Sequence, residues 1–309
     1  MATPRRELTP DLFEPIKASL QVSERTAGPP IGFWSDSWRR LRKNRGAYLG
    51  LVVIVVLVAA ACVGPLLSPY TPYGQDLARR FVGPSPEFWF GTDDFGRDMW
   101  SRVWAGTRVS LYIGFLAAFL DLVVGVAYGA ISGLFGGRAD DVMQRGIEIL
   151  NGIPYLVVAI LAMLVLSPGI VTITIAIGIA SWTPMARIVR GRMLQLKEQE
   201  FALASRSLGA SRTRLLIKHL IPNSLGPIVV NLMFTIPLAI FAEAFLSFIG
   251  LGIQPPETSL GALISDGYKE LRFHPYLLWC PAVVFSLLMI SFNLLADGLR
   301  DALDPKMRK

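Results

Sequence analysis

Two acidic residues, Asp121 and Glu243, each interrupt a long run of otherwise uncharged and mostly apolar residues. A charge inside a membrane costs about 2.5–3.5 kcal/mol on insertion scales, so each acid should face a water-filled path, a partner helix or the protein interior. Glu243 lies close to Phe245 and Phe248. We consider two roles there, a gate or translocation path and a structural hydrogen bond. Asp121 lies near glycines that favour close helix packing, so a structural role is preferred and a place in the path is the second interpretation.

A second group of charges, formed by Asp93, Asp94, Arg97 and Asp98, precedes the apolar run that contains Asp121. These side chains can pair with one another, and a self-paired cluster at the outer surface is one interpretation. The other is a docking surface for a soluble protein, or a wall of an outer gate. The sequence leaves both open.

Between residues 187 and 226 the chain becomes polar and basic, with long apolar runs on both sides. Gly209 suits the left-handed position just past a helix C-terminus, and Ser211 can cap the next helix. Pro222 interrupts that helix on the way back to the membrane. We predict two short helices that present one protruding element to a soluble partner; the alternative is a plain cytoplasmic loop with good helix propensity. The candidate contact residues are Glu200, Phe201, Ala204, Ser205, Leu208, Gly209, Ala210, Ser211, Arg214 and Pro222.

The sequence does not indicate a nucleotide-binding, metal-binding or catalytic site. It contains no Gly-x4-Gly-Lys-Ser/Thr phosphate loop, so we do not expect the chain to bind ATP itself. His219 and His274 are predicted on opposite sides of the membrane, and we expect no metal site. Cys62 and Cys280 both lie in apolar runs and are interpreted as small core residues. The chain is therefore not expected to be an enzyme, and energy for transport must come from another chain.

Composition places these residues in a membrane protein. Of 309 residues, 52% are hydrophobic, and the mean hydropathy of +0.48 is too high for an ordinary soluble domain. A crossing takes about 20 helical residues, so the uncharged run 149–186 is divided at Pro168 and Gly169. We predict an all-α integral membrane protein with a transmembrane domain at 46–309. Its six spans are predicted at about 48–67, 109–135, 149–166, 170–186, 227–251 and 275–296.

The distribution of basic residues predicts the orientation. Under a six-span topology, 23 of the 30 Lys and Arg residues lie on the side of the termini and 7 on the other side. The positive-inside rule places both termini and the 187–226 segment in the cytoplasm. Because the basic residues flank apolar spans, the net charge of +7 does not indicate a nucleic-acid partner.

Two shorter segments precede the first span. Residues 1–32 are predicted to form a flexible cytoplasmic tail. In 33–45, Trp34 and Trp38 share a helical face and basic residues cover much of the rest. This pattern indicates an amphipathic helix lying in the membrane interface. The alternative is a charged flank that anchors the first span.

The polar segment also resembles a known family. Gly209, nine residues, and then HLIP at 219–222 are similar to the signature of ABC importer permeases, which reads Glu-Ala-Ala, three residues, Gly, nine residues, Ile-x-Leu-Pro. The sequence departs from it in two places. Residues 203–205 read LAS, with Glu200 three positions too early, and His219 replaces the usual isoleucine. We therefore still expect this segment to couple the permease to an ATPase subunit, but we expect no specific acidic contact at position 203.

Three further segments narrow the resemblance. Residues 90–111, 242–267 and 293–308 resemble the second, C-type subunit of dipeptide and oligopeptide permeases, in the expected order over most of 33–309. The resemblance implies a type I ABC importer fold in a bacterial or archaeal cytoplasmic membrane, with 187–226 as the coupling segment. It implies a non-catalytic permease subunit that pairs with a second related permease and with two ATPase subunits, which bind ATP and Mg. It also implies an extracytoplasmic peptide-binding protein as the partner of the outer surface.

Alternatives to a peptide importer remain at this point. The same fold could import another cargo, such as a nickel chelate, glutathione or an oligosaccharide. An ion-coupled secondary transporter would use its buried acids to relay protons, and it would be expected to contain inverted repeats, which we do not find. A membrane scaffold would use the 187–226 element only to recruit a soluble protein.

Overall fold

The computed structural model describes residues 32–166 and 169–303, so the predicted tail at 1–32 lies almost wholly outside the described residues. Within those ranges all regular elements are helical, and the one β-bridge joins Thr92 to Asp98. The helices are α2 Phe33–Lys43, α3 Arg45–Leu67, α4 Met99–Leu120, α5 Val126–Phe135, α6 Gly137–Gly152, α7 Tyr155–Leu166, α8 Ile170–Leu196, α9 Glu200–Ser207, α10 Arg212–Leu215, α11 Ile221–Asn223, α12 Leu225–Phe248, α13 Leu260–Lys269 and α14 Tyr276–Leu303.

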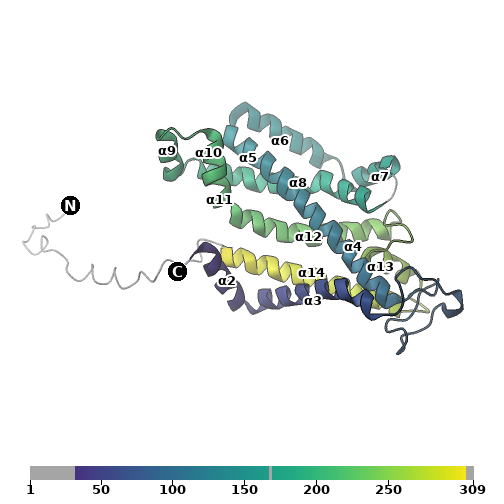
Figure 1. Ribbon diagram of the computed structural model, residues 1–309. Helices are drawn as coiled ribbons and strands as arrows, with labels where there is room; N and C mark the ends of the chain where they lie inside the picture. The colour runs from purple at the N-terminus through teal and green to yellow at the C-terminus, as the bar shows by residue number, and fades with distance from the viewer. Residues whose placement is uncertain (1–31, 167–168, 304–309) are drawn as a thin grey trace, which may run out of the picture.

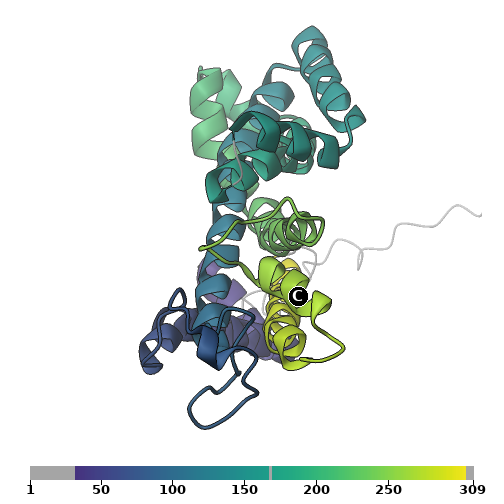
Figure 2. The same ribbon diagram turned by 90° about the vertical axis from the view of Figure 1, so that its right-hand side faces the viewer.

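The long helices form an elongated bundle (Figure 1). Seen along its length, α3 and α14 lie on one side and α5 to α8 on the other, with α12 between them and α4 passing from one side to the other (Figure 2). One apolar core joins α3, α4, α12 and α14, and a second joins α5, α8 and the start of α12. The α5–α8 contact is close because Gly129 lies against the backbone of Ala186, where a Cβ would not fit.

Five helices are long and apolar enough to cross a membrane, and they overlap five of the six predicted spans. They are Arg45–Leu67, Met99–Phe135, Ile170–Leu196, Leu225–Phe248 and Tyr276–Leu303. A sixth span requires that α6 and α7 be taken together, and these two helices are bent by 82° relative to each other. The count of six spans therefore stays a prediction.

The predicted third span at 149–166 is not one helix. It contains the end of α6, a break at Ile153 and Pro154, and α7. Proline disfavours the helical conformation of the residue before it, and Ile153 is extended, with φ −90° and ψ 120°. α6 itself begins at Gly137, so only Gly136 separates it from α5.

The second span begins earlier than predicted, at Met99 instead of about 109. Asp98 caps this helix by accepting a hydrogen bond from the Ser101 amide. Arg102, which lies in the part of the helix before the predicted start, is only 3% exposed and lies 3.2 Å from the Asp93 carboxylate. Pairing with a carboxylate allows the arginine inside the helix.

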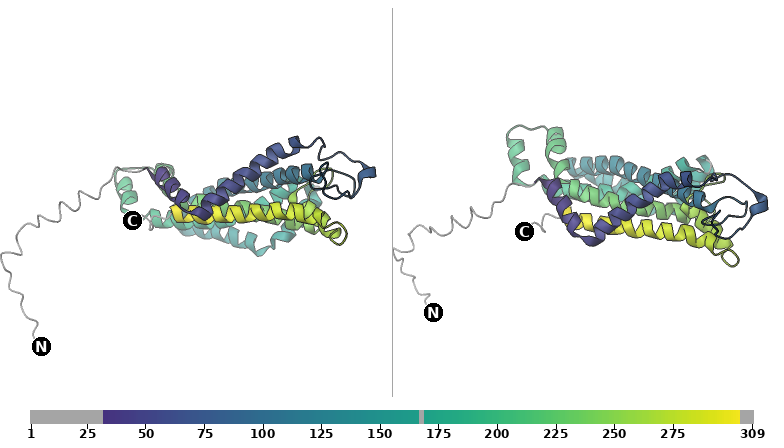
Figure 3. Two further views of the ribbon diagram at one scale, coloured as in Figure 1. Left: turned by 90° about the horizontal axis from the view of Figure 1, so that it is seen from below. Right: turned by 60° about the horizontal axis from the view of Figure 1, so that its bottom comes forward.

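The two ends of the bundle differ in character (Figure 3). The loop at 68–98 lies at one end, and α2 lies at the other end together with α9 and α10. In α2, Trp34 and Trp38 are 59% and 44% exposed, while Asp36 pairs with Arg39 and Arg40. The segment predicted as a helix at 33–45 thus contains α2, and its place in the membrane interface stays a prediction. Asn44 separates α2 from α3 by capping α3.

Candidate functional site

The polar segment 187–226 folds into a helical hairpin that leaves the bundle and returns to it. Its first ten residues extend α8 to Leu196, after which α9 and α10 form the two arms. Gly209 has a φ of +82°, the left-handed conformation predicted for it. The amide of Ala210 donates to the Ser205 carbonyl at 3.0 Å, which closes the end of α9. Ser211 then caps α10 by accepting from the Arg214 amide, also as predicted.

One side of this hairpin, which we call the coupling hairpin (residues 197–223), is anchored in the bundle. Ala202, Leu215 and Leu220 have no exposed surface. They pack into the same apolar core as residues of α5 and α8, which include Leu134, Met185, Val189 and Met193. A displacement of the hairpin would therefore act directly on α5 and α8.

The other side of the coupling hairpin is open. Leu208, beside the turn, is 89% exposed, and Phe201 and Leu203 are 40% and 49% exposed. Most of the predicted contact residues lie on this side, although Ser205 and Ala210 are half-buried. The exposed ones are Glu200, Phe201, Ala204, Leu208, Gly209, Ser211, Arg214 and Pro222. An exposed apolar tip of this kind is a surface that a partner protein could bind, but contact with an ATPase stays a prediction.

A partly buried ion pair beside the hairpin was not predicted. Arg190 of α8 donates through Nε and Nη2 to the two carboxylate oxygens of Asp140 in α6, at 2.6 and 2.7 Å. Ser132 of α5 also donates to Asp140, and Gln144 donates to Ser132. We call these four residues the inner clamp. It joins α5, α6 and α8 near the point where the hairpin leaves the bundle. The sequence signal was weak, since Asp140 and Gln144 are simply one helical turn apart.

We expect Asp140→Asn to weaken the inner clamp and lower the activity of the protein more than its membrane insertion. The variant keeps the shape of the side chain but leaves the Arg190 charge without its bidentate partner, at a cost of about 2 kcal/mol. Thermal unfolding of the purified protein and uptake in proteoliposomes would measure the two effects. Asp141→Asn is the matched control, because Asp141 is the neighbouring exposed acid. Equal behaviour of the two variants would contradict a role for the clamp.

Glu243 is fully buried and holds three helices together. Its carboxylate accepts hydrogen bonds from Ser247 of α12 at 2.7 Å, from Ser259 at the start of α13 at 2.5 Å, and from Ser110 of α4 at 3.2 Å. Ser110 and Ser259 in turn accept from the backbone amides of Leu260 and Ala262. This arrangement favours the structural interpretation for Glu243, and a role in the path stays a prediction.

The other predicted path residues are not brought together with Glu243. Phe245 and Phe248 are 45% and 49% exposed on the outer surface of α12, whereas Glu243 is inside the bundle. Asp121, also without exposed surface, lies at a π-helical turn, Asp121–Gly125, where it accepts from Thr235 at 2.6 Å and from Asn231 at 3.2 Å. It therefore links the long second helix to α12.

The outer charged cluster is mostly internal. Asp93, Arg97 and Asp98 are 6%, 5% and 3% exposed. Arg97 pairs with Asp93 at 2.6 Å, and Asp98 accepts from Ser68 and Ser101. Of the four predicted docking residues, only Asp94 presents about half of its side chain to solvent. Burial, with the Asp93 carboxylate beside it, raises the pKa of the Asp94 carboxyl above its ordinary value. Any docking role of the other three would be indirect, through the shape of the loop.

Among the described residues, no three His, Cys, Asp or Glu side chains lie together in a way that could hold a metal ion. The apolar outer surfaces of the helices are extensive. Exposed large side chains occur along α3, α4, α12 and α14, for example at Val55, Phe119, Phe241 and Ile290. Such surfaces face lipid or partner helices in a membrane protein.

Comparisons with known proteins give a consistent result. Residues 125–309 match the family described as "Binding-protein-dependent transport system inner membrane component", and residues 32–84 match "N-terminal TM domain of oligopeptide transport permease C". The oligopeptide transport system permease protein OppC of Bacillus subtilis is 46% identical, over 97% of this chain and 98% of the relative. The dipeptide transport system permease protein DppC of the same organism is 48% identical, over 91% of this chain and 88% of the relative.

A more distant relative and a solved structure extend the comparison. The OppC protein of Escherichia coli is 43% identical, over 96% of this chain and 97% of the relative. Among solved structures, a chain of the MetNI methionine ABC transporter in an inward-facing conformation is similar, with a TM-score of 0.53 and 20% identity over 66% of this chain and 96% of that chain. At that identity the similarity concerns the fold alone.

Proposed function

The chain belongs to the binding-protein-dependent transport system inner membrane component family, and we propose that it is the permease subunit of an ATP-driven importer of di- or oligopeptides. It has the fold of type I ABC importer permeases. The observation that carries the coupling part of this proposal is the hairpin around Gly209. It is anchored by fully buried Ala202, Leu215 and Leu220 and exposes Leu208. The names of the relatives supply the cargo class.

The mechanism assigns separate tasks to the parts of the chain. An ATPase that closes on ATP and Mg would displace the open side of the coupling hairpin. Leu215 and Leu220 would carry the displacement into α5 and α8, and the inner clamp would extend it to α6. A ligand can drive this displacement only if it binds the displaced and the undisplaced state of the protein with different affinity. Nucleotide and peptide must therefore each prefer one of these two states.

The partners follow from the same proposal. A second related permease would cover part of the exposed apolar helix surface, two ATPase subunits would bind at the hairpin end, and a peptide-binding protein would dock at the other end, where the 68–98 loop lies. Both termini and the hairpin would then face the cytoplasm. The described chain ends, at residues 32 and 303, are compatible with this arrangement because α2 and the last turn of α14 are on the hairpin side (Figure 3).

Uptake of a labelled peptide mixture by proteoliposomes that contain the complete complex tests the proposal. We expect uptake to require ATP inside the vesicles and to be unaffected when the proton gradient is collapsed. Loss of uptake only on collapse of the gradient would support an ion-coupled transporter instead. ATP-dependent uptake of glutathione or a nickel chelate, without peptide uptake, would keep the fold and change the cargo. Unimpaired uptake by a complex without this chain would mean that the chain acts only as a scaffold.

A further inference from the structure

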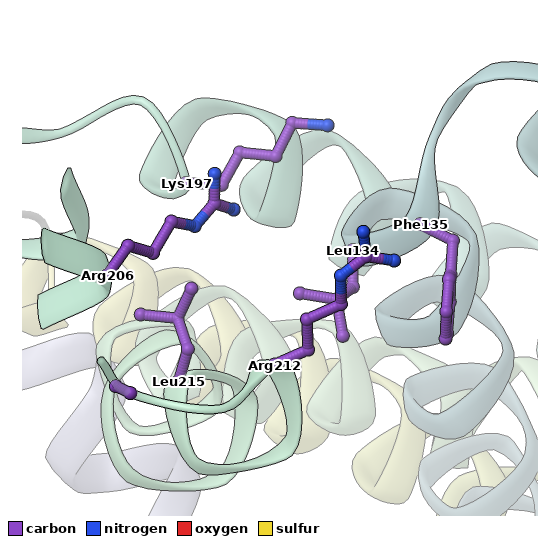
Figure 4. Close-up of a pocket in the computed structure, with 7 residues that line it drawn as sticks. Leu134, Phe135, Lys197, Arg206, Arg212 and Leu215 are labelled. Carbon is purple, nitrogen blue, oxygen red and sulfur yellow. The ribbon is translucent and has the colours of Figure 1, made fainter.

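A cavity of about 430 Å³ lies on the bundle side of the coupling hairpin (Figure 4). It is lined by side chains from four segments: the end of α5, the end of α8, α9, and the turn into α10. The lining residues are Leu134, Phe135, Lys197, Arg206, Ala210, Arg212 and Leu215. We call it the basic cavity, because three of the seven residues are cationic and none is acidic.

The three cationic groups are available to an anion. No carboxylate lies within 4.0 Å of Lys197, Arg206 or Arg212 in the part of the chain that the structure describes. Lys197 donates one hydrogen bond to the Gly133 carbonyl at 3.2 Å, which leaves two of its three donors. The Arg212 guanidinium lies over the Phe135 ring, with 5.5 Å to the ring centre, and Figure 4 shows it extending toward that residue. Three cationic side chains from separate segments therefore line one cavity.

The position of the basic cavity indicates which anion. Leu134 and Phe135 are the last residues of the long apolar helix, which ends where Gly136 takes a φ of +65°. Phe135 is 54% exposed at that end. One wall of the cavity therefore belongs to the membrane-spanning part of the chain and the other to the polar hairpin. If the long apolar helix spans the membrane, its end would lie near the level of the phospholipid phosphates, where basic groups attract anionic lipids.

We propose that the basic cavity binds the phosphodiester headgroup of an anionic phospholipid. Arg206 and Arg212 can each offer paired N–H donors to phosphate oxygens, and Lys197 adds a third charge. The exposed ring of Phe135 and the side chain of Leu134 suit the glycerol and first acyl carbons. A lipid held there would connect the end of α5 to α10, and so would fix the coupling hairpin to the bundle. A carboxylate of a partner protein would use the charges but not the apolar wall.

Lipid retention by the purified full chain tests this inference. The protein is placed in nanodiscs of phosphatidylcholine with a minor fraction of phosphatidylglycerol, released into the gas phase, and analysed by native mass spectrometry. We expect selective retention of phosphatidylglycerol, and we expect the double variant R206Q/R212Q to reduce it about tenfold or more, since each basic group contributes separately. The matched control is R192Q/K218Q, which removes two charges from exposed residues at the same end of the molecule.

The controls separate the other occupants of the cavity. Equal loss in both double variants, or no selectivity in the wild-type chain, would overturn the proposal. Binding of inorganic phosphate in detergent without retention of phosphatidylglycerol would assign the site to a free anion and overturn it as well. Displacement of the lipid when the ATPase subunits are added would assign the cavity to a protein carboxylate. Circular dichroism of R206Q/R212Q checks that the helices are intact.

Discussion

Replacing Gly209 by proline is expected to abolish peptide uptake while leaving the chain in the membrane and ATP hydrolysis by the proposed ATPase subunits measurable. The native φ of Gly209 is +82°, whereas a proline ring fixes φ at about −65°. Proline also removes the Gly209 amide, which donates to the Arg206 carbonyl at 2.9 Å. The turn between α9 and α10 cannot persist, so the open side of the coupling hairpin would lose its shape. Uptake and ATPase activity of the same reconstituted complex would measure the separation of the two activities.

Matched substitutions at Gly209 isolate the conformational cause. A Cβ at this position would meet no atom within 4 Å, so steric contact cannot explain a loss. Gly209→Val places a β-branched residue at positive φ and should cost about 1–2 kcal/mol, which is roughly tenfold in an equilibrium that needs the native turn. Gly209→Asn should keep most uptake, because asparagine tolerates this region. Uptake at the wild-type level in the proline variant would remove the coupling role of the hairpin.

The turn chemistry of the hairpin could be predicted from the sequence because it depends on neighbouring residues only. A glycine past the end of a helix and a serine before the next one have the same local roles in most folds. Gly209 and Ser211 adopt these roles in the structure. The long uncharged runs were equally informative about the membrane-spanning helices. A charge is costly inside a membrane, so a span must be nearly free of charge, and such runs have few other uses.

Helix boundaries were predicted less well where a charge has a partner or a proline breaks an apolar run. The second span was predicted to begin at about 109, but the helix begins at Met99 and includes Arg102, which pairs with Asp93. The run 149–166 looked long enough to cross the membrane, but Pro154 divides it and the helices on either side are bent by 82°. In the first case the missing information is a tertiary contact, and in the second it is the direction of the chain after the break.

Contacts between distant residues were beyond the sequence. Asp140 and Arg190 are 50 positions apart, and Ser110 and Glu243 are 133 apart. Nothing in the local pattern of either residue identifies its partner, because both partners lie on helices with several possible neighbours. In the outer cluster, the pairing of Asp93 with Arg97 was one of the two interpretations of the sequence, because the residues are four positions apart. The burial of both side chains depends on the fold of the whole loop and was not predicted.

Replacing Glu243 by leucine is expected to lower the stability of the folded chain by roughly 3 kcal/mol and to reduce the yield of assembled complex. Three serine hydroxyls, from α4, α12 and the start of α13, lose their common acceptor, at about 1 kcal/mol each. Thermal unfolding in detergent and the recovery of complex would measure the effect. Glu257→Leu is the control, because Glu257 is an exposed acid that accepts one hydrogen bond from the Tyr73 hydroxyl.

Glu243→Gln distinguishes a structural acid from one in a translocation path. The amide oxygen of glutamine can accept from Ser247 and Ser259, and its NH₂ can donate to the Ser110 oxygen, so the three helices stay connected. We therefore expect stability, yield and uptake close to those of the wild-type chain. A variant with native yield but little uptake would mean that the negative charge itself acts during transport, and Glu243 would then belong to the path. Since leucine removes both the charge and the acceptors whereas glutamine removes only the charge, the two variants together separate the two roles.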